Sequence, residues 1–298
     1  MVYKKSVSER TFDVVNIIFL SILVIICAYP LYYVLMCSLS DPYQLMKHKG
    51  ILLKPLGFTL NGYKLVFQNP SIRTGFFNTL FYVIAGTFVN MLLTAMSAYV
   101  ISRKNLMCHK FLMIMITIPM FFSGGLIPFY LQVQRLGLIN TRWALIFPSA
   151  LSIWNLIILR TAFNSVPESL IESAKLDGAN DFTILFKIII PLSKATLAVI
   201  ALFYAVGHWN SWFNAMIFLR DRTKFPLQLI LREILISNET REMMNNLPRT
   251  SAQFIQAEAY KTLIKYCTII VSTLPIVCVY PFIQKYFVKG VMLGSTKE

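Results

Sequence analysis

Five polar and aromatic side chains lie close together in a stretch of the chain that is otherwise apolar. They are His208, Trp209, Asn210, Trp212 and Asn214. On one continuous helix the two tryptophans, three positions apart, would share a face, and so would the two asparagines, four positions apart. Indole faces can stack on the apolar faces of sugar rings, and carboxamides both donate and accept hydrogen bonds with hydroxyls. The cluster therefore predicts either contact with an uncharged or weakly charged saccharide or an aromatic belt at a membrane surface.

Two further asparagines, Asn90 and Asn155, lie in other apolar stretches. Asn155 is another candidate for a substrate path, although such side chains more often hydrogen-bond to a neighbouring helix. His208 is the one ionisable residue within these stretches, and a lone histidine there is more typical of hydrogen-bonded packing than of a proton relay. Ion-coupled carriers usually mark their pathway with charged side chains. An ion-coupled carrier is therefore the less favoured alternative.

Several kinds of chemistry are missing from the sequence. It has no G-x-x-x-x-G-K-[ST] loop to cradle a phosphate, and the pair Gly124 and Gly125 lies in an apolar stretch without the required lysine. It has no H-E-x-x-H motif, and none of its cysteines forms a C-x-x-C pair. We therefore expect this chain to bind no ATP and no metal, and to be no enzyme by itself.

A polar segment lies between the fourth and fifth apolar stretches. Ser165 and Glu168 have the spacing of a capping box, with Pro167 in the first turn. Gly178 is typical of a helix stop. These signals predict a short helix over Val166–Asp177, which is too short and too polar to span a bilayer.

The same segment combines small side chains with charges. The small residues are Ser173, Ala174, Gly178 and Ala179, and the charged ones are Glu172 and Asp177. A small surface with fixed charges suits a rigid docking element, but a plain surface helix that closes a loop would look the same. Asp181 offers a second helix start, leading into 182–190.

Composition indicates that lipid surrounds most of the chain. Of 298 residues, 56% are hydrophobic and 14% are charged, whereas soluble domains carry roughly 25% charged residues. A helix needs about 20 apolar residues to cross a bilayer. The windows that lack Asp, Glu, Lys and Arg and approach or exceed this length are Val14–Ser40, Thr74–Ser102, Phe111–Gln134, Trp143–Leu159, Ala195–Leu219 and Tyr266–Gln284. The sequence therefore predicts an all-α membrane protein with six transmembrane helices in a single transmembrane domain, residues 1–298.

Charge and loop length bear on orientation. The net charge of +15 comes from Lys and Arg spread between the windows, which is typical of segments that face lipid head groups and argues against nucleic acid as a partner. The short basic turn 103–110 favours a cytoplasmic N-terminus. The long segments 41–73 and 220–265 would then lie outside, as connectors or as contacts for a soluble partner. The second contains a predicted short helix over Pro226–Ile236.

Residues 172–191 resemble the EAA loop of binding-protein-dependent ABC import permeases. The family pattern is E-A-A, three residues, G, nine residues, I, one residue, L and P. Ser173 replaces the second position and Ile190 the leucine, and both changes are conservative. The resemblance implies that the loop, about 165–191, is cytoplasmic and docks on an ATPase subunit. The coupling residues that it implies are Glu172, Ser173, Ala174, Asp177, Gly178, Ile188 and Pro191.

Three weaker motifs, 136–144, 205–213 and 287–295, resemble the sugar-importing branch of that family, in the subunit similar to the maltose-type second permease. The resemblance covers nearly the whole chain and implies the type I ABC importer permease fold, in the bacterial cytoplasmic membrane, with both termini cytoplasmic. The implied partners are a second homologous permease chain, two ATPase subunits that bind ATP and Mg, and an external solute-binding protein. This protein would deliver a carbohydrate such as an oligosaccharide. An importer of the same family for a non-sugar solute is the nearest alternative.

Overall fold

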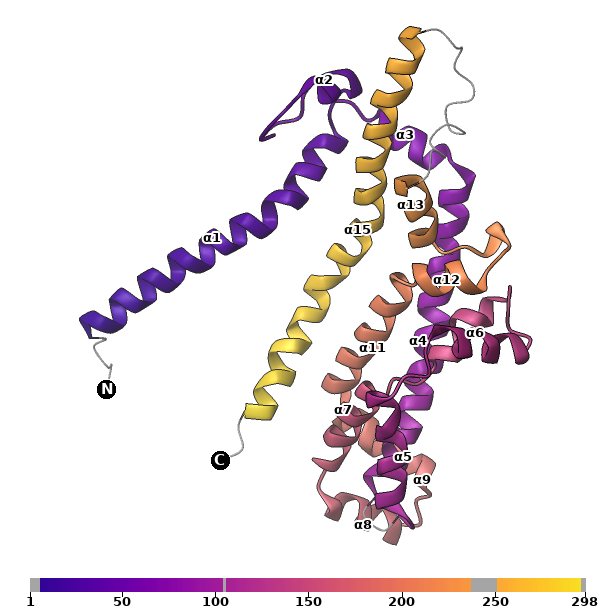
Figure 1. Ribbon diagram of the computed structural model, residues 1–298. Coiled ribbons are helices and arrows are strands. Elements are labelled where there is room, and N and C mark those ends of the chain that lie inside the picture. Colours follow the sequence, from indigo (N-terminus) through magenta and orange to yellow (C-terminus); the bar gives the residue numbers. More distant parts are fainter. Residues whose placement is uncertain (1–5, 104–105, 237–250, 296–298) are drawn as a thin grey trace. The chain divides into compact units, whose positions relative to one another are not determined.

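The computed structural model describes residues 6–103, 106–236 and 251–295, and all regular secondary structure within them is helical (Figure 1). The longer helices are α1 (Val7–Ser38), α4 (Pro70–Ser102), α5 (His109–Phe121), α6 (Leu126–Arg135), α7 (Ile153–Asn164), α11 (Lys194–Trp209), α13 (Leu227–Ile236) and α15 (Ser251–Ser295). The shorter ones are α2 (Pro42–Lys47), α3 (Asn61–Gln68), η1 (Arg142–Leu145), η2 (Phe147–Ser149), α8 (Glu168–Leu176), α9 (Asp181–Ile184), η3 (Leu185–Ile189), α10 (Ile190–Leu192), α12 (Trp212–Phe218) and η4 (Arg222–Lys224). The predicted all-α class is confirmed.

The chain divides into an N-terminal unit, Met1–Asn69 with Ile234–Thr273, and a central unit, Pro70–Glu233 with Leu274–Glu298. In the N-terminal unit, α1 begins with a capping box in which the Ser6 amide donates to the Glu9 carboxylate over 2.8 Å. Nearly the whole of α1 is apolar and exposed, and only its last two residues are buried. A helix that is apolar on every side fits a lipid environment.

The predicted outer segment 41–73 contains α2, α3 and the first turn of α4. Cys37, Leu45 and Leu52 form a small buried core with neighbouring side chains of the N-terminal unit. The Asp41 carboxylate accepts the amides of the first turn of α2, as an N-cap does. This segment is therefore folded against the end of α1 and is more than a connector.

The central unit is built around α4, which packs against α7 and α11 (Figure 1). One core cluster lies at the α4 end that carries Tyr99 and includes Leu156, Phe163 and Ile189. A second cluster surrounds Tyr82, nearer the start of α4. The segment α8 lies at the Tyr99 end, and α13 begins beside the other end, where the Leu227 amide donates to Thr79 over 2.8 Å. A single long helix thus joins the two ends of this unit.

Among the described residues, three helical segments are long and apolar enough to cross a membrane, Val7–Ser38, Pro70–Ser102 and Glu258–Val279. Of the other predicted windows, the third and fourth fall on helix pairs bent by 118° (α5 with α6) and 52° (η1 and η2 with α7). The fifth covers α11 and α12, and α11 forms a pair bent by 89° with the preceding α9 to α10. Up to 6 spans result among the described residues if each pair counts as one. The third window breaks because Gly125 has a φ of +86°, which favours glycine. The predicted six spans are therefore reached only with the three bent pairs, which are broken and not continuous helices.

The last part of the predicted outer segment 220–265 is helical, because α15 begins at Ser251. Residues 251–265 include Gln, Ala, Glu and Lys, which are good helix formers and therefore continue the helix. Glu and Lys are charged, so this stretch was not part of the predicted apolar window. Residues 237–250 of the predicted segment lie outside the described part of the chain. The predicted short helix over 226–236 is confirmed as α13.

The part of this segment that follows α12 folds back on α4. The Asn78 amide donates to the carbonyls of Thr223 and Phe225, over 2.7 and 3.1 Å, and the Tyr82 hydroxyl donates to the Lys224 carbonyl over 2.7 Å. The Thr223 hydroxyl and amide donate to Asp221 and lower the pKa of that carboxyl. The turn is therefore held by side chains of α4.

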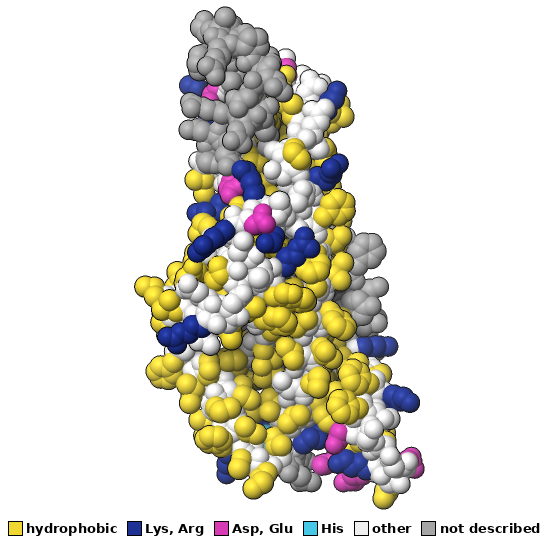
Figure 2. Space-filling model, turned by 90° about the vertical axis from the view of Figure 1, so that its right-hand side faces the viewer, with side chains coloured by type: hydrophobic (Ala, Val, Ile, Leu, Met, Phe, Trp, Pro, Cys, Tyr) yellow, Lys and Arg dark blue, Asp and Glu magenta, His cyan; other side chains and the backbone are white. Residues whose placement is uncertain are grey.

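Figure 2 shows one face of the molecule with a broad area of hydrophobic side chains and charged side chains gathered above and below it. Many large apolar residues are exposed, such as Phe77, Ile84 and Phe88 along α4. Soluble proteins rarely expose a contiguous apolar area of this kind. Charged groups on either side of an apolar band are typical of a protein that spans a bilayer.

Candidate functional site

The segment that resembles a coupling loop forms a short helix, α8, over Glu168–Leu176. The predicted start at Val166 and the capping box are wrong. Ser165 directly follows α7, and its hydroxyl donates to the Ala162 carbonyl over 2.7 Å. It thereby satisfies a carbonyl of the last turn of α7 and cannot cap α8, whose N-cap is Pro167.

The end of α8 follows the prediction. Gly178 has a φ of +80°, a conformation that glycine adopts without a steric penalty. The Gly178 amide donates to the Lys175 carbonyl over 3.0 Å, and the Ala179 amide donates to the Ala174 carbonyl over 2.9 Å. These two bonds form a Schellman motif, which stops the helix sharply.

One side chain of α8 anchors it to the unit. Ile171 is its one buried residue and joins the core cluster of Tyr99 and Phe163. Ala174 and Ala179 are partly buried against the same cluster. Ala174 and Ala179 therefore allow α8 to lie close to the helices behind it, whereas the other two small residues, Ser173 and Gly178, are exposed.

The outer surface of α8 and of the start of α9 carries charges and unexpected apolar side chains. Glu172, Ser173 and Asp177 are exposed, and so are Leu176 and Phe182, with 89% and 62% of their surface accessible. Sequence reasoning missed these two apolar residues. Leu176 could have been found, because it lies five positions after Ile171 and so on a different side of the helix.

Beyond α8 the chain returns to the spans through three short helical pieces. The Asn180 side chain accepts the Thr183 amide over 2.8 Å and is the N-cap of α9, one residue before the predicted start at Asp181. The Tyr99 hydroxyl donates to the Asp181 carboxylate over 2.6 Å. Ile188 is half-buried in the π-helical turn η3, and Pro191 is exposed in α10. The predicted coupling residues thus lie along one continuous segment tied to α4.

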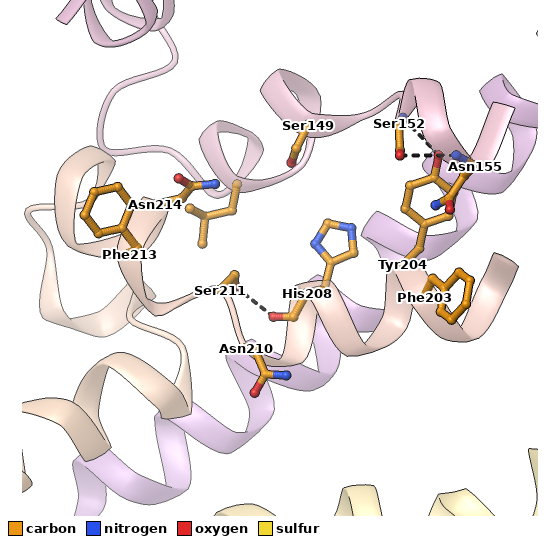
Figure 3. A pocket seen from close by; sticks show the side chains of 12 residues that line it. Ser149, Ser152, Asn155, Phe203, Tyr204, His208, Asn210, Ser211, Phe213 and Asn214 are labelled. Atoms are coloured by element: carbon orange, nitrogen blue, oxygen red, sulfur yellow. Dashed lines mark hydrogen bonds between the residues drawn. The ribbon is translucent and has the colours of Figure 1, made fainter. Parts of the chain in front are cut away.

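A second site is a pocket of about 430 Å³ in the central unit, between α11 and α12 on one side and the break between η2 and α7 on the other (Figure 3). Among the residues that the structure describes, no Asp, Glu, Lys or Arg lines it. Its small polar lining residues are Ser149, Ser152, Asn155, Asn210, Ser211 and Asn214. Phe203 and Phe213 add aromatic faces. Such a lining suits an uncharged, hydroxylated group.

Four of the six predicted substrate-path residues line this pocket. They are His208, Asn155, Asn210 and Asn214. The tryptophans do not line it. The Trp209 ring is buried edge-on against Phe76, with centroids 6.2 Å apart, and the Arg232 guanidinium lies 4.5 Å from the centre of the Trp212 ring.

The expectation that these residues share one helix is wrong. Asn210 ends α11, Ser211 precedes α12, and the Asn210 side chain donates to the Val206 carbonyl over 3.1 Å. The break turns the two tryptophans to different surroundings. Polar residues that compete for backbone hydrogen bonds favour such a break, which is a signal that the sequence did contain.

Two side chains of α11 tie the pocket wall to α4. The Tyr204 hydroxyl oxygen lies 2.7 Å from the Thr94 hydroxyl and accepts the Ser152 amide over 3.0 Å. One turn later, His208 Nε2 lies 2.6 Å from Asn90 Oδ1. For His208 and Asn90, these contacts agree with the predicted hydrogen bonding between helices. The Asn90 side-chain nitrogen also donates to the backbone at the break before α7.

Comparison with known proteins identifies relatives of this chain. No family model matches it. It is 40% identical over 290 residues to the polygalacturonan/rhamnogalacturonan transport system permease protein YtcP of Bacillus subtilis (strain 168), covering 97% of this chain and 99% of the relative. It is 38% identical to protein LplC of the same organism, covering 97% and 95%.

A solved structure agrees with these relatives. It is a bacterial ABC transporter involved in the import of the acidic polysaccharide alginate, and one of its chains matches with a TM-score of 0.86 and 31% identity, over 96% of this chain and 100% of that chain. Identity and coverage of this size show common descent along the whole chain. The protein therefore belongs to the family of ABC transport system permeases, the multi-pass membrane subunits of these transporters.

Proposed function

We propose that this chain is the translocation subunit of an ATP-driven importer of a carbohydrate, such as an oligosaccharide. Its relatives include permeases named for polygalacturonan and rhamnogalacturonan, for lactose and for melibiose, raffinose and stachyose. The uncharged pocket with amide, hydroxyl and aromatic groups supports the same substrate class. ATP is hydrolysed by separate subunits, because the sequence has no phosphate-binding loop.

The proposed assembly contains a second permease chain, two ATPase subunits with ATP and Mg, and an external solute-binding protein. The chain crosses the membrane six times, with the three bent pairs as broken spans, and both termini are cytoplasmic. Irregular backbone within the membrane is tolerated where it lines a cavity or is buried in protein. The break between η2 and α7 lines the pocket, which supports this topology.

The single observation that carries the mechanism is the construction of α8. Ile171 fastens it to the core, Gly178 ends it sharply, and its outer face presents Leu176 beside Glu172. An element that is fixed on one side and apolar on the other can dock on a partner and pass a movement to the helices behind it. Closure of the ATPase pair would thus move the pocket between outward and inward access.

Two substitutions test the docking role in the assembled transporter. Glu172→Ala and Leu176→Glu should both reduce the amount of ATPase that copurifies with the permease, and transport should fall with it. Leu136→Glu is the matched control, because Leu136 is also exposed, at 63%, but lies far along the chain from α8. Unchanged ATPase recovery and transport in both α8 variants would contradict the proposal.

Uptake tests the substrate class. Proteoliposomes with all the proposed subunits should take up a carbohydrate from a panel of oligogalacturonides, rhamnogalacturonan oligomers, raffinose and lactose, and uptake should stop without ATP. Uptake driven by an ion gradient without ATP would instead identify an ion-coupled carrier. Uptake of peptides but of no carbohydrate would identify an importer for another solute.

A further inference from the structure

The side-chain amide of Asn90 has one orientation that its surroundings allow. Its nitrogen donates to the carbonyls of Ser149 and Ala150, over 2.9 and 2.8 Å, at the break before α7. Both amide hydrogens are therefore used, and Oδ1 faces His208 Nε2 at 2.6 Å. Because an amide oxygen can only accept, Nε2 must carry a hydrogen. In the neutral imidazole the other nitrogen, Nδ1, is then an acceptor.

The position of the imidazole is fixed by a glycine. A side-chain carbon at Gly86 would lie 2.5 Å from His208 Cε1 and 2.7 Å from Cδ2, and would also meet Nε2. The far edge of the ring therefore lies directly against the backbone of α4. His208 is 6% exposed and lines the pocket, and within the described residues Nδ1 has no hydrogen-bond partner. Figure 3 shows the ring directed into the pocket.

The neighbouring side chain of α11, Tyr204, differs from His208 because its polar atom is already hydrogen-bonded. Tyr204 lies one turn before His208 on the same face of α11, and its hydroxyl group is engaged with Thr94 and with the Ser152 amide. Its oxygen accepts from the Ser152 amide and shares a second hydrogen bond with the Thr94 hydroxyl, in which the donor is either oxygen. Of the two side chains that tie α11 to α4, only His208 keeps an unused polar atom at the pocket.

We propose that His208 Nδ1 accepts a hydrogen bond from a hydroxyl of the transported saccharide, and that Asn90 is the positioning residue that fixes the required tautomer. This inference rests on the proposed function and names the chemistry of its site. The described residues that line the pocket include no Lys or Arg to pair with a carboxylate. The group that binds there is therefore a hydroxylated, uncharged part of a sugar ring, also in an acidic oligosaccharide.

The tautomer is measured directly by nitrogen-15 NMR of the reconstituted transporter with labelled histidine. The chain has 3 histidines, and the spectrum of His208→Gln identifies the signal of interest. We expect neutral His208 to carry its hydrogen on Nε2 in the wild type, and both tautomers to appear in Asn90→Leu. A wild-type His208 with its hydrogen on Nδ1 would overturn the inference, whatever the variants do.

Substrate contact is measured by uptake of labelled digalacturonate and raffinose into proteoliposomes. The His208→Gln side chain can still donate to Asn90 but has a carbon in place of Nδ1. We expect the KM of uptake to rise roughly two- to tenfold, as for the loss of one hydrogen bond, with little change in kcat. His109→Gln is the matched control, because that histidine lies outside the pocket, beside the Ile101 carbonyl.

The results that would overturn the His208 contact differ from those that would overturn the proposed function. An unchanged KM in His208→Gln, with normal wild-type uptake, would overturn the contact and leave the carbohydrate importer intact. Absence of wild-type uptake of every carbohydrate of the panel would overturn the proposed function, and with it the contact. If His208→Gln does not reach the membrane, added raffinose or digalacturonate should still shift one of the wild-type histidine Nδ1 signals, and a spectrum in which neither sugar shifts any of them during active uptake would count against the contact.

Discussion

At the scale of single residues, the lack of a side chain at Gly86 leaves room for the His208 ring beside α4. Gly86→Ala would place a methyl group against the His208 ring. The ring would have to move and would lose its hydrogen bond to Asn90. Overpacking of this kind destabilises by about 1–3 kcal/mol, which exceeds the gain of roughly 1 kcal/mol from replacing glycine in a helix. We expect a lower Tm in detergent.

Gly207→Ala is the control for that substitution. Gly207 is also helical, but a methyl group there would meet no atom within 4 Å. This variant should therefore keep or raise the Tm. A Gly86→Ala protein as stable as the control would show that the His208 ring can move freely, and that the contact with α4 has little energetic weight.

Residue types could be predicted better than their partners. The sequence identified His208, Asn155 and the two asparagines of the broken span, because polar groups in an apolar stretch need hydrogen-bond partners. It could not show that Asn90 is the partner of His208, because they are 118 positions apart. Nor could it separate Trp209, which packs on Phe76, from the residues that line the pocket.

At the scale of elements, the stop of α8 depends on Gly178. An alanine there would have to adopt a φ of +80°, at a cost of roughly 1–2 kcal/mol. We expect Gly178→Ala to loosen the last turn of α8, so that hydrogen exchange of its amides becomes about five to thirty times faster. Mass spectrometry of peptides from 168–180 would measure this.

Ser169→Ala provides the comparison, because Ser169 is an exposed residue within α8 and alanine favours helices. Its exchange should stay equal or become slower. Equal exchange in Gly178→Ala and in the wild type would mean that Ile171 alone holds α8, and that the Schellman motif adds little.

Element boundaries were predicted well where a local rule decides them. Gly178 ends α8 as expected, since its own backbone conformation requires glycine. Ser165 misled the prediction, because a serine between two helices can serve either one, and here it serves α7. The breaks at Gly125 and at Asn210 were also missed, because hydropathy reports only that a window is apolar and not that its helix is continuous.

At the scale of the whole molecule, the number of crossings follows from the three bent pairs. Leu136, Ser173 and Arg220 all lie between α4 and α15 along the chain. If only the three long helices crossed, these residues would lie on one side of the membrane. With six crossings, Ser173 lies on the opposite side of the membrane from Leu136 and Arg220, and in the proposed orientation its side is the cytoplasm.

Cysteine labelling in intact cells distinguishes the two topologies. The native cysteines, Cys27, Cys37, Cys108, Cys267 and Cys278, are first replaced by serine or alanine. Single cysteines are then introduced by Leu136→Cys, Ser173→Cys and Arg220→Cys, all at exposed positions. A membrane-impermeant maleimide should label the first and the third, whereas the second should need a permeant reagent. Equal accessibility of all three would leave only three crossings, and a reversed pattern would place α8 outside, where no ATPase could reach it.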